Sequence, residues 1–187
     1  MGQENYSRPF VQREVTLYTQ SAKNAIEYLR DIDRAFSRAY KFCHQCSSKD
    51  IGKLDSLMDN ILRTLENDIE QGIKELDSRC AEARAPSLSY SKPFNKTVQI
   101  THPGTFRFID LILSFDTLLR LADKLHFAML VDDSEHVLFQ KNLRIKLMKL
   151  KRDIEELATW KKITELFKPS EDSVVAVHPE THSASNL

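Results

Sequence analysis

The sequence predicts a mainly α-helical protein in which an N-terminal β-strand precedes a bundle of about four helices. Apolar residues recur at spacings of three and four along most of the chain, as they do on the buried face of a helix. Only four glycines and six prolines interrupt 187 residues, which suits long helices joined by few turns. The exception is segment 10–19, where polar and apolar side chains alternate as in a half-buried strand.

The predicted strand covers residues 11–18. Its apolar and polar side chains fall on opposite faces, with Val11, Val15 and Leu17 on one and Gln12, Glu14 and Thr16 on the other. A lone strand cannot satisfy its own backbone N–H and C=O groups, so it must pair with another strand. We expect the partner to be the same strand of a second chain, which gives a dimer joined by an intermolecular ribbon. A partner strand within the same chain is the alternative.

The first two helices are predicted on either side of a serine-rich break. Thr19 or Ser21 can cap the first helix, which stops near Cys46. The second helix covers about 51–83 and carries more acidic than basic residues. Its apolar residues form a stripe close to a heptad seam. A linker rich in serine and proline follows.

The third and fourth helices complete the predicted bundle. Segment 97–100 could form a second short strand, and the third helix then starts at Pro103. This helix is apolar nearly all round, so we expect it at the centre. The fourth helix follows the break at residues 132–134 and runs to about Phe167. We therefore assign residues 1–168 to one helical domain and expect the polar residues 169–187 to form a disordered tail.

Composition excludes some classes of protein. The 27 basic and 27 acidic side chains balance to a net charge of zero, which argues against a purely electrostatic nucleic-acid binder but not against local basic patches. Three cysteines are too few for a disulfide scaffold, so we expect a reducing, cytoplasmic setting. No signal peptide is visible, and the most apolar stretch is interrupted by charged residues, so we expect no membrane partner.

Catalytic and metal motifs are weak in this sequence. Cys43-His-Gln-Cys46 has the spacing of half a zinc site, but a full site needs two more ligands. We interpret it as a cysteine pair in a helical turn. There is no glycine-rich phosphate loop, nucleophile elbow or helical His-Glu pair of the metalloprotease kind. The sequence thus predicts a protein that is not an enzyme and uses no metal or cofactor.

Two basic surfaces are candidates for contact with double-stranded DNA. Strand side chains can read base edges and cations can hold phosphates, which selects a first set: Arg8, Gln12, Arg13, Thr16 and Lys23. In this set Gln12, Arg13 and Thr16 would lie in or beside a groove, while Arg8 and Lys23 would hold phosphates. The run 141–152 holds six cations and no acid, and gives a possible second surface: Lys141, Arg144, Lys149 and Arg152. A solvated helix face is the alternative for this run.

Two blocks of the sequence resemble the AcaB-type family of conjugative plasmids and integrative elements. The first is Arg13-Glu-Val-Thr-Leu-Tyr-Thr19 before an alanine-bearing helix. The second joins Val98-Gln-Ile-Thr-His-Pro103 to Leu111-Ile-Leu-Ser-Phe-Asp116, with Leu118, Leu119, His126 and Leu130. The resemblance covers residues 8–150. It implies a transcriptional regulator of conjugative transfer genes with a ribbon-helix-helix-like DNA-binding element, here in an elaborated helical form because the first helix is long.

We therefore expect a dimeric DNA-binding regulator. The alternative is a helical interaction or scaffold protein whose acidic second helix and long apolar seam bind a protein partner.

Overall fold

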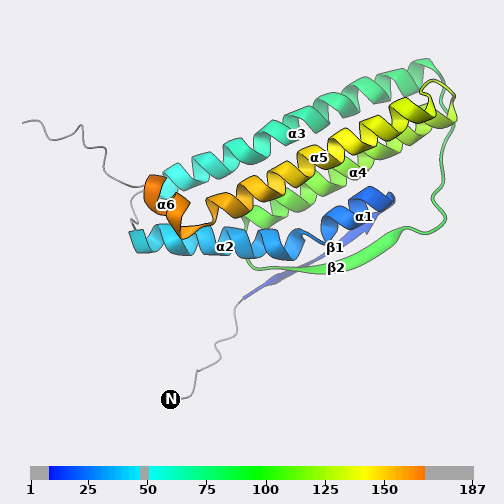
Figure 1. The fold of residues 1–187 in the computed structure, drawn as a ribbon. Coiled ribbons are helices and arrows are strands. Elements are labelled where there is room, and N and C mark those ends of the chain that lie inside the picture. Colours follow the sequence, from blue (N-terminus) through cyan, green and yellow to red (C-terminus); the bar gives the residue numbers. More distant parts are fainter. Residues whose placement is uncertain (1–8, 47–50, 167–187) are drawn as a thin grey trace, which may run out of the picture.

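The computed structural model describes residues 9–46 and 51–166. Its elements follow in the order β1 (Val11–Leu17), α1 (Gln20–Ile26), α2 (Leu29–Cys46), α3 (Ile51–Glu82), β2 (Phe94–Ile100), α4 (Gly104–Phe127), α5 (Asp133–Leu157) and α6 (Trp160–Leu166). The long helices α3, α4 and α5 lie side by side, and the strand pair lies along one flank of the bundle with α1 and α2 (Figure 1). The mainly helical class with an N-terminal strand is confirmed. The predicted tail lies outside the described residues.

The partner of β1 is β2 of the same chain. The two strands are antiparallel, with Val11 opposite Ile100 and Leu17 opposite Phe94. The expectation that β1 takes its backbone hydrogen bonds from a second chain is wrong, and the alternative of an internal partner holds. The physical reason is that β2 carries the same alternation as β1, so both strands can bury one face on the same helices. Dimerisation itself stays a prediction.

The apolar side of the strand pair belongs to the main core. Val15, Leu17, Val98 and Ile100 are buried with the inward residues of every helix. Helix α4 contacts α1, α2, α3 and α5, as expected for the central helix. The apolar seam of α3 is also buried in this core, so it is not available to another protein.

Two predicted helices are each divided in the structure. The first predicted helix is α1 and α2, because the chain turns at Tyr28, whose backbone N–H donates to the carbonyl of Ala25 at 3.1 Å. The fourth is α5 and α6, which meet at Ala158 and Thr159. The apolar spacing continues through both turns, because both helices of each pair bury a face on one core, and spacing alone does not show a change of axis.

A buried carboxylate on α4 fixes the junction between β1 and α1. Asp116 is only 3% exposed. It accepts hydrogen bonds from the backbone N–H of Tyr18 at 3.1 Å and of Thr19 at 2.8 Å, and from the Thr19 hydroxyl at 2.7 Å. Thr19 in turn caps α1 by accepting from the backbone N–H of Ala22.

A second buried carboxylate, on α2, fixes the junction between β2 and α4. Asp33 is 7% exposed. It accepts from the backbone N–H groups of Thr101 and His102, each at 3.1 Å, and from the Thr105 hydroxyl at 2.7 Å. Asp33 and Asp116 therefore hold opposite ends of the strand pair against the helices.

His102 makes this second junction sensitive to pH. Its ring lies 5.4 Å from Phe36 and 4.5 Å from Tyr40, and its Nδ1 accepts from the backbone N–H of Gly104 at 3.1 Å. Burial lowers the pKa of His102 below its ordinary 6.5, against the opposing pull of Asp33 and Asp55. The unfolded chain therefore binds more protons than the folded protein just below pH 6.5.

We expect this difference to reduce stability in mild acid. The contribution of His102 is full above about pH 6.5 and declines as the pH falls from there to the lowered pKa. Urea unfolding measured across this range should lose stability more steeply for the wild type than for His102→Asn, whose amide oxygen can still accept from Gly104. His44→Asn, at an exposed position on α2, is the control and should keep the wild-type slope. Equal slopes for wild type and His102→Asn would refute this assignment.

Candidate nucleic-acid interface

A row of cations runs along the outward face of α2. Helix α2 buries Ile32, Ala35, Phe36, Ala39 and Cys43 in the core. The opposite side carries four exposed basic residues, Arg30, Arg34, Arg38 and Lys41, which we call the α2 cationic row. Their spacing of four, four and three places them within about 80° of one another around the helix axis. None of them pairs with a carboxylate of the described residues.

The α2 cationic row lines a groove whose other wall is β2. The groove has a volume of about 1190 Å³, and its β2 wall includes Lys96, Thr97 and Gln99. Lys96 is neutralised by an ion pair with Glu27 at 2.7 Å. Glu155 also lines the groove, but it pairs with Lys151. Two further carboxylates line the groove without a cation partner among the described residues: the exposed Asp31 and the buried Asp33, which accepts hydrogen bonds at the α4 junction. The four cations of the row outnumber these two carboxylates, so the groove keeps an excess of positive charge on the α2 side.

The outward face of the strand pair is polar, with one carboxylate, Glu14, and no cation. It consists of every second residue of each strand: Gln12, Glu14, Thr16, Asn95, Thr97 and Gln99. Thr16 donates to the side-chain oxygen of Asn95 at 2.8 Å. We call these six residues the ribbon face. Amide and hydroxyl groups of this kind can donate to and accept from base edges.

Arg13 lies on the other side of the ribbon. It has the same parity as Val15 and Leu17, and its guanidinium donates to Asp110 of α4 at 2.6 Å. Arg13 therefore does not lie on the same side of the ribbon as Gln12 and Thr16, while its predicted contact with DNA stays a prediction. Its charge is already paired, at a site where the Asp110 carboxylate is 61% exposed.

The remaining residues of the first predicted set lie in different places. Gln12 and Thr16 are exposed on the ribbon face as predicted. Lys23 is exposed on α1, with its ammonium 5.1 Å from the ring centre of Phe94 at the start of β2. It lies beside one end of the ribbon and pairs with no carboxylate of the described chain. Arg8 lies outside the described residues.

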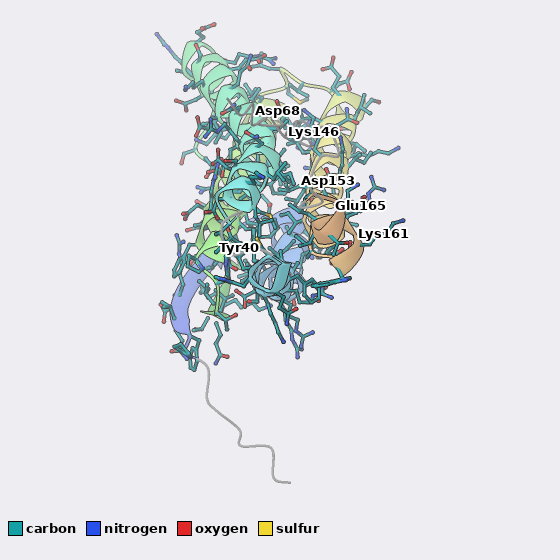
Figure 2. All side chains as sticks on the ribbon, turned by 90° about the vertical axis from the view of Figure 1, so that its left-hand side faces the viewer. Tyr40, Asp68, Lys146, Asp153, Lys161 and Glu165 are labelled. Carbon is teal, nitrogen blue, oxygen red and sulfur yellow. The ribbon has the colours of Figure 1, made fainter. Side chains whose placement is uncertain are left out.

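The second predicted basic surface is exposed on α5. Of the six cations in the run 141–152, Lys146 pairs with Asp68 of α3 at 2.6 Å, and Lys151 pairs with Glu155 at 2.6 Å. Asp68 and Lys146 are labelled in Figure 2. The other four, Lys141, Arg144, Lys149 and Arg152, are the ones predicted as a surface, and none pairs with a described carboxylate. Glu155 lines both the α2 groove and a smaller hollow on α5, so the two basic regions adjoin.

Of the two cysteines in the predicted half zinc site, the side chain of Cys43 is the one that the structure describes. Cys43 is fully buried on the core side of α2, and no group of three or more His, Cys, Asp or Glu residues in the described ranges is placed to hold a metal ion. Cys80 is also buried, with its thiol 3.7 Å from the carbonyl oxygen of Leu121. Likewise, no helix of residues 9–46 and 51–166 has the length and apolar character needed to cross a bilayer.

Sequence reasoning did not identify the α2 cationic row as a site. Its members were visible only as part of a modest excess of basic residues near the N-terminus. The available signal was their spacing, because residues that recur at four, four and three share one face of a helix. The wall supplied by β2 had no local signal, since it comes from a segment far along the chain.

Comparison with known proteins supports the fold. No protein-family model matches the chain, and no curated protein sequence matches it significantly. Among solved structures, the chain matches the crystal structure of selenomethionine-containing AcaB from uropathogenic E. coli with a TM-score of 0.77. The match has 18% sequence identity and covers 85% of this chain and 86% of the AcaB chain. The chain therefore has the fold of AcaB, as the resemblance of its sequence to the AcaB-type family implies.

Proposed function

We propose that the protein is a non-enzymatic transcriptional regulator that binds double-stranded DNA. The observation that carries this proposal is the α2 cationic row. Four exposed cations without carboxylate partners concentrate positive potential in one groove of a protein whose total charge is zero. Contacts between such cations and phosphates release counterions, which supplies most of the affinity of a sequence-independent complex.

The ribbon face complements this row with groups suited to base edges. A two-stranded ribbon fits the major groove of B-DNA, where glutamine and asparagine can bond to adenine and threonine can contact a thymine methyl. In this protein one chain supplies both strands, so a ribbon does not require a second copy. On this proposal Gln12, Asn95 and Gln99 lie in the groove, while the α2 cationic row and Lys23 hold the flanking phosphates.

The biological role rests on similarity. The AcaB fold and the sequence blocks that resemble the AcaB-type family support a role in controlling conjugative transfer genes. A homodimer belongs to the same proposal, because two copies related by a two-fold axis would place their ribbons on two half-sites of one operator.

Salt-dependent DNA binding tests the role of the α2 cationic row. Arg34→Ala combined with Arg38→Ala should weaken binding to specific and random duplexes alike and lower the salt slope of log K by about two units, since each phosphate contact contributes close to one. The matched control is Lys74→Ala with Arg79→Ala, which removes two exposed cations from α3, away from the groove. Fluorescence anisotropy over a salt series gives both quantities.

The same titrations test the ribbon face. A duplex selected from a random library should lose about 1–3 kcal/mol of binding free energy when Gln99 is replaced by alanine, while a scrambled duplex is unaffected. If the salt slope of the variant with Arg34→Ala and Arg38→Ala equalled that of the wild type, the α2 cationic row would not contact DNA phosphates. Failure of the wild type to bind any duplex would refute the proposed function.

A further inference from the structure

Helix α5 has a second apolar stripe on the side that faces away from the core. Its inward face buries Leu143, Leu147, Leu150, Ile154 and Leu157, as a bundle helix should. On the outward side stand four large apolar side chains with exposures of 44% to 64%: Val137, Leu138, Ile145 and Met148. The outward face of a surface helix is normally polar, so four large apolar side chains on one side of it indicate an interaction site.

Cations lie within and beside this stripe. Lys141 and Arg152 fall between the apolar residues around the helix axis, and Arg144 and Lys149 flank them. Ile145 and Met148 line a hollow of about 480 Å³ together with Arg144, Lys149 and Arg152. Lys151 and Glu155 also line it, but they pair with each other. The surface therefore alternates apolar and positively charged side chains, with cations both within the stripe and beside it.

This chemistry differs from that of the α2 cationic row. DNA phosphates require cations and gain nothing from exposed leucine, isoleucine or methionine side chains, which remain in contact with water in such a complex. A lipid bilayer is also a poor fit. Burial of the stripe in the acyl region would take Lys141 and Arg152 with it, whereas interfacial helices keep their cations on the opposite face.

A second copy of this chain does not complement the surface either. Two copies of α5 related by a two-fold axis would bring their cations together. Helix α3 is acidic, but none of its large apolar side chains is exposed, so it offers no apolar face to the stripe.

We propose that the outward face of α5 is a docking surface for an acidic amphipathic helix of another protein. Residues 137–152 span about 22 Å, or some four helical turns, at 1.5 Å per residue. A partner helix of this length can place apolar residues against Ile145 and Met148 and carboxylates against Arg144 and Lys149. In this mode of recognition a partner helix binds in a groove. The apolar contacts supply most of the affinity, and the ion pairs fix the orientation of the partner helix.

A display experiment with the full-length protein tests the proposal. A random peptide library with inserts of about 16 residues, long enough to cover the stripe as a helix, is selected on the wild type. We expect the enriched peptides to be acidic, with apolar residues at spacings of three and four. Their affinity should fall about 10- to 100-fold for Ile145→Ser combined with Met148→Ser, because two central anchors are lost. Arg144→Glu combined with Lys149→Glu should abolish binding of the acidic peptides, because it reverses the charge beside the stripe.

The controls separate the alternatives. Phe127→Ser with Met129→Ser removes two exposed apolar side chains outside the stripe and should leave peptide binding unchanged. The serine double variant at 145 and 148 should bind random duplex DNA and vesicles of phosphatidylcholine and phosphatidylglycerol as the wild type does. Enrichment of non-acidic peptides, no enrichment, or equal binding by the serine variant would overturn the proposal. Selective loss of DNA or vesicle binding would reassign the surface to that ligand.

Discussion

Asp116→Ala is expected to lower the free energy of unfolding by about 3–5 kcal/mol, because the substitution removes a buried carboxylate and leaves three partly buried donors without their acceptor. The backbone N–H groups of Tyr18 and Thr19 and the Thr19 hydroxyl all donate to this carboxylate. The methyl group of alanine can accept from none of them. The loss should be measured by urea unfolding with circular dichroism.

Asp110→Ala is the matched control for that measurement. Asp110 lies on the same helix, and its exposed carboxylate pairs only with Arg13 among the described residues. Exposed pairs contribute roughly 0–1 kcal/mol, so the control should unfold close to the wild type. Similar losses in the two variants would show that the Asp116 hydrogen bonds do not fix the start of α1.

Asp33→Ala should cost a comparable amount, about 3–5 kcal/mol, at the other end of the ribbon. The carboxylate accepts from two consecutive backbone N–H groups, at Thr101 and His102, and from the Thr105 hydroxyl inside the first turn of α4. Its loss leaves the entry to the central helix without these acceptors. Denaturant unfolding and amide hydrogen exchange of residues 101–105 should both report the change.

The neighbouring Asp31 supplies the comparison. It is exposed on α2 and its carboxylate accepts no hydrogen bond from a described residue, so Asp31→Ala should change stability by less than about 1 kcal/mol, mainly through its place in the first turn of the helix. If Asp33→Ala unfolded at the same urea concentration as Asp31→Ala, the anchoring role of Asp33 would be refuted.

The helical part of the fold follows from sequence periodicity. The stripe of α3 and the all-round apolar character of α4 predicted a long helix packed on a central one, and the structure has both. The strand β2 was only partly predicted, as 97–100 and not as 94–100. Asn95, Lys96 and Thr97 are three consecutive polar residues, so polar and apolar residues do not alternate at the start of the strand. Its pairing with β1 depends on contacts between distant segments, for which a local pattern carries no information.

The candidate site shows a different limit. Arg13 has the parity of Val15 and Leu17, so the alternation of the strand puts it on the side that faces the helices. Its charge favours a contact with DNA, whereas its position on the strand favours the contact with Asp110 that the structure has. The α2 cationic row was missed because its residues were counted together and not placed on a helix face.

The ribbon also determines when the protein can finish folding during synthesis. Tyr18 and the carboxylate that anchors it, Asp116, are 98 residues apart in sequence. At about 5–20 residues per second, the ribosome needs roughly 5–20 s to add the second after the first. Throughout that interval the first strand has emerged without β2 or α4 to cover it, and its apolar face and unpaired edge remain open to chaperones. The segment proposed to enter DNA is thus made before the two segments, β2 and α4, that fix its structure.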